Sequence, residues 1–314
     1  MGATPITALS PLSRLQLFFA LSRTPHGLLD LATPALAALL WLGGFPSLRV
    51  TLLGLLTAFA GYTAVYALND LVDYRVDREK LQGIGKRGDG GYLDAVMVRH
   101  PLAQGLLSLK ESLFWVGGWA LTALVGAYLL NPVCALIFLA GCLLEAAYCL
   151  MLTVSHLRTL VSGVVKTLGG VAAVYAVAPQ PSPLFLLLLF LWLFAWEIGG
   201  QNIPADWHDL EEDRRLQART IPVRYGPPGA AGIILGCLGI SVALSALVLG
   251  LAPARLPLLL AAGGLGLGFC LLLRPAWRLY RTQARAQASS LFNQASYYPL
   301  AMLLIILAGF LFAS

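Results

Sequence analysis

Charge is the property that this sequence lacks most. Only 11% of its 314 residues are Asp, Glu, Lys or Arg, whereas 58% are hydrophobic and the mean hydropathy is +0.77. Soluble domains carry about 25% charged residues. The composition therefore excludes a soluble globular protein and predicts an integral membrane protein of one domain, residues 1–314. Little room is left for a separate soluble domain, and we expect no nucleic-acid partner.

Cysteine is also scarce, and its spacing excludes two further classes of protein. The five cysteines lie in apolar stretches, and no two of them have the Cys-x-x-Cys spacing. This pattern argues against a disulfide framework and a zinc site and predicts small side chains in the core or facing lipid. The N-terminus lacks a charged segment followed by an apolar core and a small-residue cleavage site, so we expect no cleaved signal peptide.

Long apolar runs are abundant instead. A helix needs about 20 apolar residues to cross a bilayer. A short amphipathic helix at the membrane interface, over residues 8–22, is predicted to precede the first of these runs. Nine spans are predicted, over residues 27–45, 51–68, 112–130, 132–152, 158–178, 183–200, 229–251, 256–274 and 296–313.

The basic residues predict the orientation of these spans. Of the 21 Lys and Arg, eighteen fall in connections that alternate onto one side of the membrane, and only Arg49 and Arg255 fall on the other. The positive-inside rule places the basic side in the cytoplasm. We therefore expect a protein of the cytoplasmic (inner) membrane with its N-terminus inside and its C-terminus outside.

Acidic residues number only 15, yet six aspartates are concentrated in two similar clusters. The first acidic motif is Asn69–Asp77 and the second is Asp206–Asp213. In each, aspartates recur at i, i+3 and i+7, which on a continuous helix places three carboxylates on one face. Like charges at this spacing repel one another, so the arrangement requires a bound cation. Both motifs fall on the predicted cytoplasmic side.

The two motifs form a weak internal repeat. Each follows an apolar span, and each has an asparagine near its first aspartate, Asn69 in one and Asn202 in the other. Such a repeat suggests two pseudo-equivalent halves that face one another across a central cavity, with the sites between them.

Carboxylates in this number suit Mg²⁺ or Ca²⁺ better than zinc or copper. Mg²⁺ usually completes its coordination shell with water and substrate phosphate. Two carboxylate clusters facing one space are therefore predicted to hold a diphosphate through Mg²⁺. A membrane site points to a polyprenyl diphosphate, whose tail stays in the bilayer. Its ionisation leaves an allylic cation, which aromatic faces stabilise. The basic candidates for the diphosphate are Arg78, Lys80, Arg99, Arg158, Lys166 and Arg214.

These motifs resemble those of a known family. Asn69–Asp77 is similar to the N-D-x-x-D-x-x-x-D signature of the UbiA superfamily of intramembrane prenyltransferases, and Asp206–Asp213 resembles its second signature. Arg99–Gly105 resembles the family's R-P-L-x-x-G segment with one inserted position, and Arg219–Gly226 resembles T-I/L-P-V-x-x-G. The resemblance covers roughly residues 20–313. Within the family, the sequence looks most like the 4-hydroxybenzoate polyprenyltransferases.

The resemblance implies an all-helical bundle of nine spans around a central cavity, with a cytoplasmic cap formed by two long loops. It implies Mg²⁺-dependent transfer of a prenyl group to an acceptor, often an aromatic ring. By motif position, the expected ligands of the metal are Asn69, Asp70, Asp73, Asp77, Asp206, Asp209 and Asp213. Asp73, Asp77, Asp209 and Asp213 are the expected catalytic residues, and one aspartate of the second motif is expected to steer or deprotonate the acceptor.

One departure from the family concerns the basic residues. The family often carries Y-x-x-x-K after the fourth span, but Tyr148 is followed four residues later by Leu152. Lys166 or Arg158 could replace the missing charge from another position. The expected substrate-binding residues are therefore Arg23, Arg78, Arg99, Tyr148, Arg158, Lys166 and Asn202.

Other ionisable residues lie within apolar spans, where they are costly. For Glu145 and Glu197, a role in the cavity and a structural pairing with a buried base both stay open. For Lys166 we favour a functional role, because a buried ammonium group needs an anion beside it. Asp30 is expected to cap a helix or to pair locally.

Three polar features favour a plain structural interpretation. The glycine-rich stretch Gly83–Gly91 lacks the spacing of a phosphate-binding loop and is predicted to be a flexible loop. The four histidines form no metal-ligand pattern, and His208 is interpreted as a solvated loop residue. Glu211 and Glu212 are predicted to form the solvated face of their helix.

Two other functions are considered beside prenyl transfer. A transporter or channel lined by carboxylates would need polar groups on both sides of the membrane, whereas the outer connections are nearly uncharged. A lipid-binding membrane protein without catalysis would not need six intact aspartates. Within the family, the acceptor could be an aromatic quinone precursor, a tetrapyrrole or a non-aromatic alcohol, and protein partners are not predicted.

Overall fold

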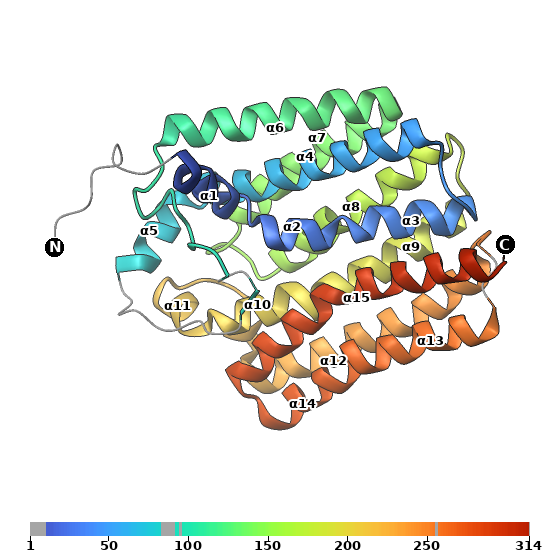
Figure 1. Cartoon of the computed structure of the whole chain (residues 1–314). Coiled ribbons are helices and arrows are strands. Elements are labelled where there is room, and N and C mark those ends of the chain that lie inside the picture. Colours follow the sequence, from blue (N-terminus) through green and yellow to red (C-terminus); the bar gives the residue numbers. More distant parts are fainter. Residues whose placement is uncertain (1–10, 83–91, 94–95, 255–256, 314) are drawn as a thin grey trace.

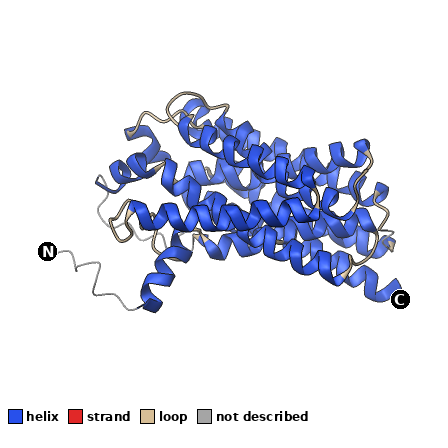
Figure 2. Ribbon diagram, turned by 90° about the horizontal axis from the view of Figure 1, so that it is seen from above, coloured by secondary structure: helices blue, strands red, loops and turns tan. Residues whose placement is uncertain are grey.

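The computed structural model describes residues 11–82, 92–93, 96–254 and 257–313. The described residues form helices and no strands, and the long helices run side by side along the molecule (Figures 1 and 2). This arrangement confirms the predicted all-α class. The glycine-rich stretch Gly83–Gly91 and residues 8–10 of the predicted interfacial helix lie outside the described residues.

Nine stretches of the described chain are long and apolar enough to span a membrane, as predicted. Their central positions agree with the sequence, but several extend further than their apolar cores. The spans are built from α2 (Thr24–Asp30) with α3 (Ala32–Leu42), α4 (Leu48–Val72), α6 (Leu109–Leu130), α7 (Pro132–Leu150), α8 (Arg158–Val177), α9 (Pro183–Trp196) with the π-helix η3 (Glu197–Asn202) and α10 (Ile203–His208), α12 (Ile221–Leu251), α13 (Leu258–Gly268) with the π-helix η4 (Phe269–Leu273) and α14 (Arg274–Thr282), and α15 (Arg285–Ala313).

The helices form because a bilayer leaves backbone polar groups no partner outside the chain. Their ends carry local signals that the sequence encodes. Ser108 and Glu111 form a reciprocal capping box at the start of α6, and Asn131 caps α7 with Pro132 in its first turn. Proline fits this position because the first helical N–H groups have no partner in the helix.

The polar segment 274–295, expected as a loop, is mostly helical. α14 continues the eighth span through η4, and α15 begins at Arg285 before its apolar run. The connection between them is therefore only residues 283–284. Apolar run length locates the buried part of a span but does not mark where the helix ends.

The N-terminal helix α1 (Pro11–Leu21) lies where the sequence predicts an interfacial helix and packs one face onto the bundle. Leu21 is fully buried, and with Leu17 it joins an apolar cluster that includes Leu107. Arg14 of α1 forms an ion pair with Glu111 at the start of α6. α1 therefore covers one end of α4 and α6.

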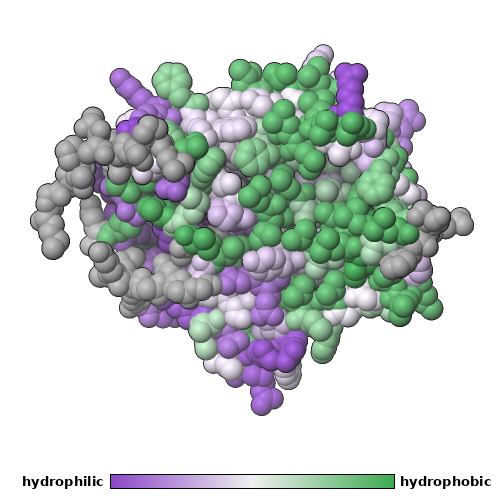
Figure 3. Space-filling view, viewed as in Figure 1, coloured by the Kyte–Doolittle hydropathy of each residue, from purple (hydrophilic) through white to green (hydrophobic). Residues whose placement is uncertain are grey.

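The end of the bundle that carries α1, α5 (Tyr74–Gln82) and α11 (Leu210–Arg215) is called the polar end. α15 finishes at the opposite end (Figure 1). In the face shown in Figure 3, hydrophilic residues gather mainly toward the polar end and α14, and hydrophobic ones cover most of the middle of this face. Lipid-facing side chains include Leu258, 86% exposed, and Phe114, 82% exposed. The described residues of the connections after the two acidic motifs, 96–108 and 216–220, also lie toward the polar end.

Candidate active site

Both acidic motifs break at their middle aspartate, which corrects the expectation of one continuous helix. α4 ends at Val72 and α5 begins at Tyr74, with Asp73 between them at φ −82°, ψ 1°. Asp209 separates α10 from α11 in the same way, at φ −93°, ψ 10°. A ψ near 0° ends each span and turns the chain across the polar end. The two motifs thus share one local conformation, as the internal repeat suggested.

Residues of both motifs line a single cavity of about 670 Å³. The cavity also reaches Val50 near the start of α4 and Val177 at the end of α8, both far from the polar end. On α4 alone, the lining from Val50 to Asp70 spans about 30 Å. The motif residues on its wall are Asn69, Asp70, Asp73, Asp77, Asp206, Asp209 and Asp213.

The first motif is held by a base that directly precedes α2 and by an acid from α7. Arg23 donates to the side-chain oxygen of Asn69 at 3.1 Å and to Asp70 at 3.4 Å. The amide of Asn69 donates to Glu145 at 2.7 Å. Glu145 therefore lies on the cavity wall and orients Asn69, which favours the role in the cavity over a structural pairing.

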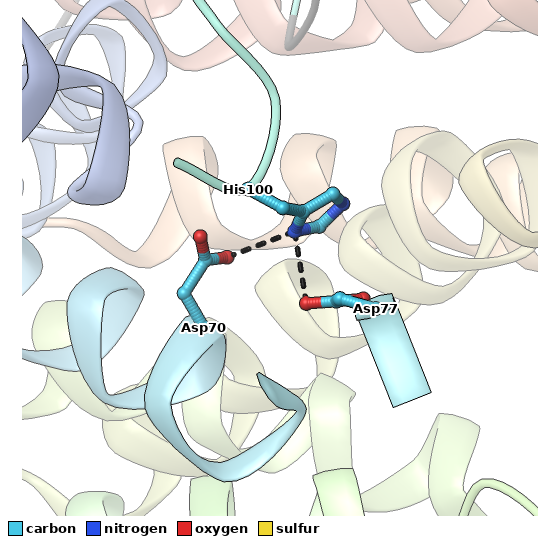
Figure 4. Close-up of side chains that lie close together, drawn as sticks. All are labelled: Asp70, Asp77 and His100. Atoms are coloured by element: carbon cyan, nitrogen blue, oxygen red, sulfur yellow. Dashed lines mark hydrogen bonds and ion pairs between the residues drawn. The ribbon is translucent and has the colours of Figure 1, made fainter. Parts of the chain in front are cut away.

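His100 lies between two carboxylates of the first motif (Figure 4). Its Nδ1 is 3.3 Å from Asp70 and 2.9 Å from Asp77. Burial opposes its charge, but the two carboxylates raise the pKa of His100 to about 9. His100 in turn lowers the pKa of Asp77, against the effect of burial. The imidazolium supplies the positive charge that the spacing of these aspartates requires.

His100 was missed from the sequence, where the histidines showed no metal-ligand pattern. Among the described residues, Asp70, Asp77 and His100 form a group whose ligand atoms lie within 4.8 Å of one another. The backbone φ of His100 is +49°, which is unusual for a residue other than glycine. The signal that could have found it is its position, because His100 is the inserted residue of the Arg99–Gly105 segment.

Each aspartate of the second motif meets a base from another element. Arg158 donates to Asp206 at 3.1 Å, and both side chains are buried. Asp209 lies 3.2 Å from Arg99. Burial opposes the ionisation of Asp209, but Arg99 and Lys80 lower its pKa.

Lys80 on α5 reaches from the first motif to the second. Its Nζ lies 3.8 Å from Asp213. Burial opposes its charge, but Asp209, Asp213 and Asp77 together raise the pKa of Lys80. Burial, opposed by Lys80 but reinforced by the neighbouring aspartates, raises the pKa of Asp213 to about 7. Burial, reinforced by the charge of Asp77, also raises the pKa of Asp73.

Arg158 supplies a positive charge beside Tyr148, where the family's lysine is missing. Its guanidinium lies 4.0 Å from the centre of the Tyr148 ring. The hydroxyl of Tyr148 accepts a hydrogen bond from Asn202 at 3.0 Å. Leu152, which occupies the lysine's position, is buried. Of the two replacements considered from the sequence, Arg158 is the one that lies at this place.

Two expected basic residues lie elsewhere. Arg78 is exposed on α5 and does not line the cavity. Lys166 does line it, but deeper, where it donates to Asp30 at 2.6 Å. Asp30 is therefore bound to a residue of a distant helix, not only capped or paired locally. Arg214, another basic candidate for the diphosphate, is exposed as well.

The structure corrects two of the plain interpretations. His208 is buried, stacks on Tyr92 with ring centroids 4.2 Å apart, and hydrogen-bonds Ser289. His208 is the last residue of α10 and Ser289 lies on α15, so this hydrogen bond links two helices that pack directly on one another. Glu212 is 7% exposed, whereas Glu211 is exposed as predicted. The turn at Asp209 rotates α11 so that Glu212 faces inward.

The residues of the second motif fit a hard divalent cation. Buried oxygens of Asp206 (Oδ2), Asp209 (Oδ1) and Asn202 (Oδ1) have no hydrogen-bond partner among the described residues. Buried polar atoms are usually satisfied, so orphaned carboxylate oxygens on a cavity wall suit a ligand. Carboxylate and amide oxygens are the donors that Mg²⁺ prefers.

Comparison with known proteins finds related sequences over most of the chain. The model of the UbiA prenyltransferase family matches residues 31–303. A 4-hydroxybenzoate octaprenyltransferase of Aromatoleum aromaticum is 27% identical over 252 residues, which are 78% of each chain.

Solved structures share the fold. The apo structure of a UbiA homolog from Aeropyrum pernix K1 has a TM-score of 0.72 at 21% identity, and the match covers 92% of this chain and 98% of that one. A UbiA homolog from Archaeoglobus fulgidus bound to GPP and Mg²⁺ has a TM-score of 0.64 at 17% identity, covering 92% and 99%.

The family match spans both acidic motifs, contains seven of the nine candidate spans of the described residues completely, and covers part of the first and the last. The sequence resemblance, the nine-span fold and the prediction of an enzyme are thereby confirmed. The chain belongs to the UbiA prenyltransferase family.

Proposed function

We propose that this protein transfers a polyprenyl group from its diphosphate to an aromatic acceptor in a Mg²⁺-dependent reaction. The observation that carries the proposal is that all seven motif residues line one cavity whose apolar part runs on along α4. Family membership favours this enzyme over the transporter and the non-catalytic lipid-binding protein.

The polar end of the cavity binds the diphosphate. The aspartates of the two motifs, with Asn69, hold Mg²⁺, which neutralises the leaving diphosphate when it is bound. Arg23, Arg158 and Arg99 lie on the cavity wall beside these carboxylates. Their guanidinium groups orient the phosphate oxygens through charge-assisted hydrogen bonds.

The apolar part of the cavity takes the prenyl tail. Its lining includes Leu55, Phe138 and Leu307, from three different helices. Keeping this region dry protects the allylic cation from water once the C–O bond to diphosphate breaks. The acceptor carbon then attacks C1 of the prenyl group, and the ring loses a proton. Tyr148, on the cavity wall beside Arg158, presents an aromatic face to the cation.

An aromatic acceptor is supported by the names of the relatives. The Aromatoleum aromaticum protein and a relative from Shewanella denitrificans, 26% identical, are both 4-hydroxybenzoate octaprenyltransferases. The excess of Lys and Arg on the side of the two motifs supports a site at the cytoplasmic face of the inner membrane.

The test is a transfer assay with purified protein. It combines labelled geranyl or octaprenyl diphosphate, Mg²⁺ and a panel of ring acceptors that includes 4-hydroxybenzoate, with product identified by mass spectrometry. We expect a prenylated ring that forms with Mg²⁺ and does not form in excess chelator. Turnover at an undiminished rate in chelator would refute the metal dependence, and transfer to no aromatic ring would refute the acceptor class.

A further inference from the structure

A second group of polar side chains lines the cavity below the acidic motifs. We call it the deep polar cluster. It lies one and two helical turns farther from the polar end than Asp70 on α4 and Arg158 on α8, which is about 6 to 12 Å. Its members on the cavity wall are Tyr62, Tyr66, Ser162, Lys166 and Glu197.

One half of this cluster is neutralised within the protein. Lys166 donates to Asp30 at 2.6 Å and to the hydroxyl of Tyr66 at 2.7 Å. Tyr66 donates in turn to the same Asp30 oxygen at 2.5 Å. Asp30 is 3% exposed, so the ammonium and its carboxylate form a buried pair. The charge of Lys166 is therefore already balanced by Asp30.

The other half is a carboxylate that the protein satisfies only in part. Glu197 is 6% exposed, and its Oε1 accepts a hydrogen bond from Ser162 at 3.0 Å. Its Oε2 has no hydrogen-bond partner, and Glu197 forms no ion pair with any described residue. The nearby hydroxyl oxygen of Tyr62 is likewise buried without a partner. An unsatisfied buried oxygen is costly unless a ligand donates to it.

The backbone holds Glu197 closely in place. It begins the π-helix η3, an element that occurs often at functional sites. A Cβ at Gly199 would lie 2.9 Å from Leu238, and one at Gly200 would lie 2.8 Å from Ala295, so η3 is pressed against α12 and α15. A Cβ at Gly163 would lie 2.7 Å from Phe194. That close approach brings the adjacent Ser162 to Glu197.

We propose that Glu197, positioned by Ser162, accepts a hydrogen bond from a hydroxyl group of the acceptor. This inference rests on the proposed function and deepens it. A carboxylate at this depth would be a third anion beside Glu197 and Asp30, whose neighbouring bases are Lys166 and the imidazole of His26, 3.8 Å from Asp30. The acceptor is therefore a hydroxylated ring that points a neutral hydroxyl, and no carboxylate, toward the deep polar cluster.

The test measures ring binding in the full-length protein, in detergent, with Mg²⁺ and the unreactive analogue geranyl thiodiphosphate. The probes are phenol, its methyl ether anisole, and benzoate. We expect phenol to bind about tenfold or more tightly than anisole or benzoate, because a hydrogen bond to a charged group is lost in both. In Glu197→Leu the preference for phenol over anisole should fall below about threefold.

Two further variants keep the test sharp. Ser162→Ala removes only the hydroxyl that orients Glu197, and should lower the phenol preference about threefold; it carries the test where Glu197→Leu does not fold. Glu145→Gln is the matched control, because it alters another buried glutamate of the cavity wall that bonds Asn69. It should keep the phenol preference and weaken Mg²⁺ binding instead.

The outcomes separate this inference from the proposed function. Equal binding of benzoate and phenol, binding of none of the rings, or an undiminished phenol preference in a folded Glu197→Leu protein would overturn the inference. The Mg²⁺-dependent binding of geranyl thiodiphosphate, measured in the same samples, tests the proposed function. If the wild-type protein did not bind geranyl thiodiphosphate in a Mg²⁺-dependent way, the result would count against the prenyl-diphosphate site itself.

Discussion

At the scale of single residues, the site is built from ion pairs between distant parts of the chain. Asp206 pairs with Arg158, and Asp209 pairs with Arg99. These pairs lie on a cavity wall, where removing one partner leaves a charge that solvent compensates poorly. The bases are thus arranged in advance beside the carboxylates, which is what the proposed Mg²⁺–diphosphate site requires.

The first prediction concerns the middle aspartates of the two motifs. Asp73→Ala and Asp209→Ala should each lower kcat for prenyl transfer about 100-fold or more, because each removes a carboxylate that we propose as a ligand of Mg²⁺ beside the leaving group. The assay is product formation under saturating Mg²⁺. Glu211→Ala, on the exposed face of α11, is the control and should keep its activity. Full activity in both aspartate variants would remove the metal assignment.

A second prediction separates the cavity-lining arginine from the exposed one. Arg158→Leu should raise KM for the prenyl diphosphate about tenfold and lower the melting temperature, since Asp206 loses its buried partner. Arg158→Lys should recover only part of the affinity, because an ammonium group cannot form a bidentate hydrogen bond or stack on the Tyr148 ring as a guanidinium does. Arg78→Ala should change neither quantity. A large effect at Arg78 with none at Arg158 would contradict this site.

What the sequence could predict of the site follows from spacing. The motif aspartates could be recognised because their repeat is local, and the structure brings them to one cavity. The role of Arg158, the exposure of Arg78 and the placement of His100 depend on how the chain turns after each motif. A helical wheel assumes a straight helix, so the breaks at Asp73 and Asp209 could not be read from periodicity.

At the scale of elements, the sixth span joins the fold to the chemistry. α9, η3 and α10 form one continuous span, and the π-helix lies between the apolar segment and the second motif. Gly199 and Gly200 allow η3 to approach its neighbours more closely than any side chain would permit. The register of Asp206 and Glu197 relative to the cavity therefore depends on this packing.

The third prediction tests that packing. In Gly199→Ala the new Cβ would lie 2.9 Å from Leu238 and 3.0 Å from the carbonyl oxygen of Ile234, which cannot move without bending α12. We expect a loss of about 1 to 3 kcal/mol in stability, seen as a lower melting temperature. Gly118→Ala on α6, where the new Cβ meets nothing within 4 Å, is the matched control. It should be neutral or slightly stabilising; equal melting temperatures for the two variants would refute the packing argument.

At the scale of the whole molecule, an odd number of spans separates the two ends of the chain. α1 and both acidic motifs lie at the polar end, whereas α15 finishes at the opposite end (Figure 1). Nine spans could be predicted because each apolar run is long enough to cross a bilayer on its own. Helix ends could not, since the polar turns of α10, α14 and α15 are stabilised by packing within the protein.

The last prediction concerns the orientation that the basic residues imply. Eighteen of the 21 Lys and Arg belong to connections on the side of the two motifs, so that side should face the cytoplasm. A fluorescent protein fused after Ser314 should then be dark and an alkaline phosphatase active, as both report an external C-terminus. The same fusions made after Thr282, before the ninth span, should give the reverse pattern. Bright fluorescence from the full-length fusion would place the motifs outside, where the proposed use of a cytoplasmic diphosphate would fail.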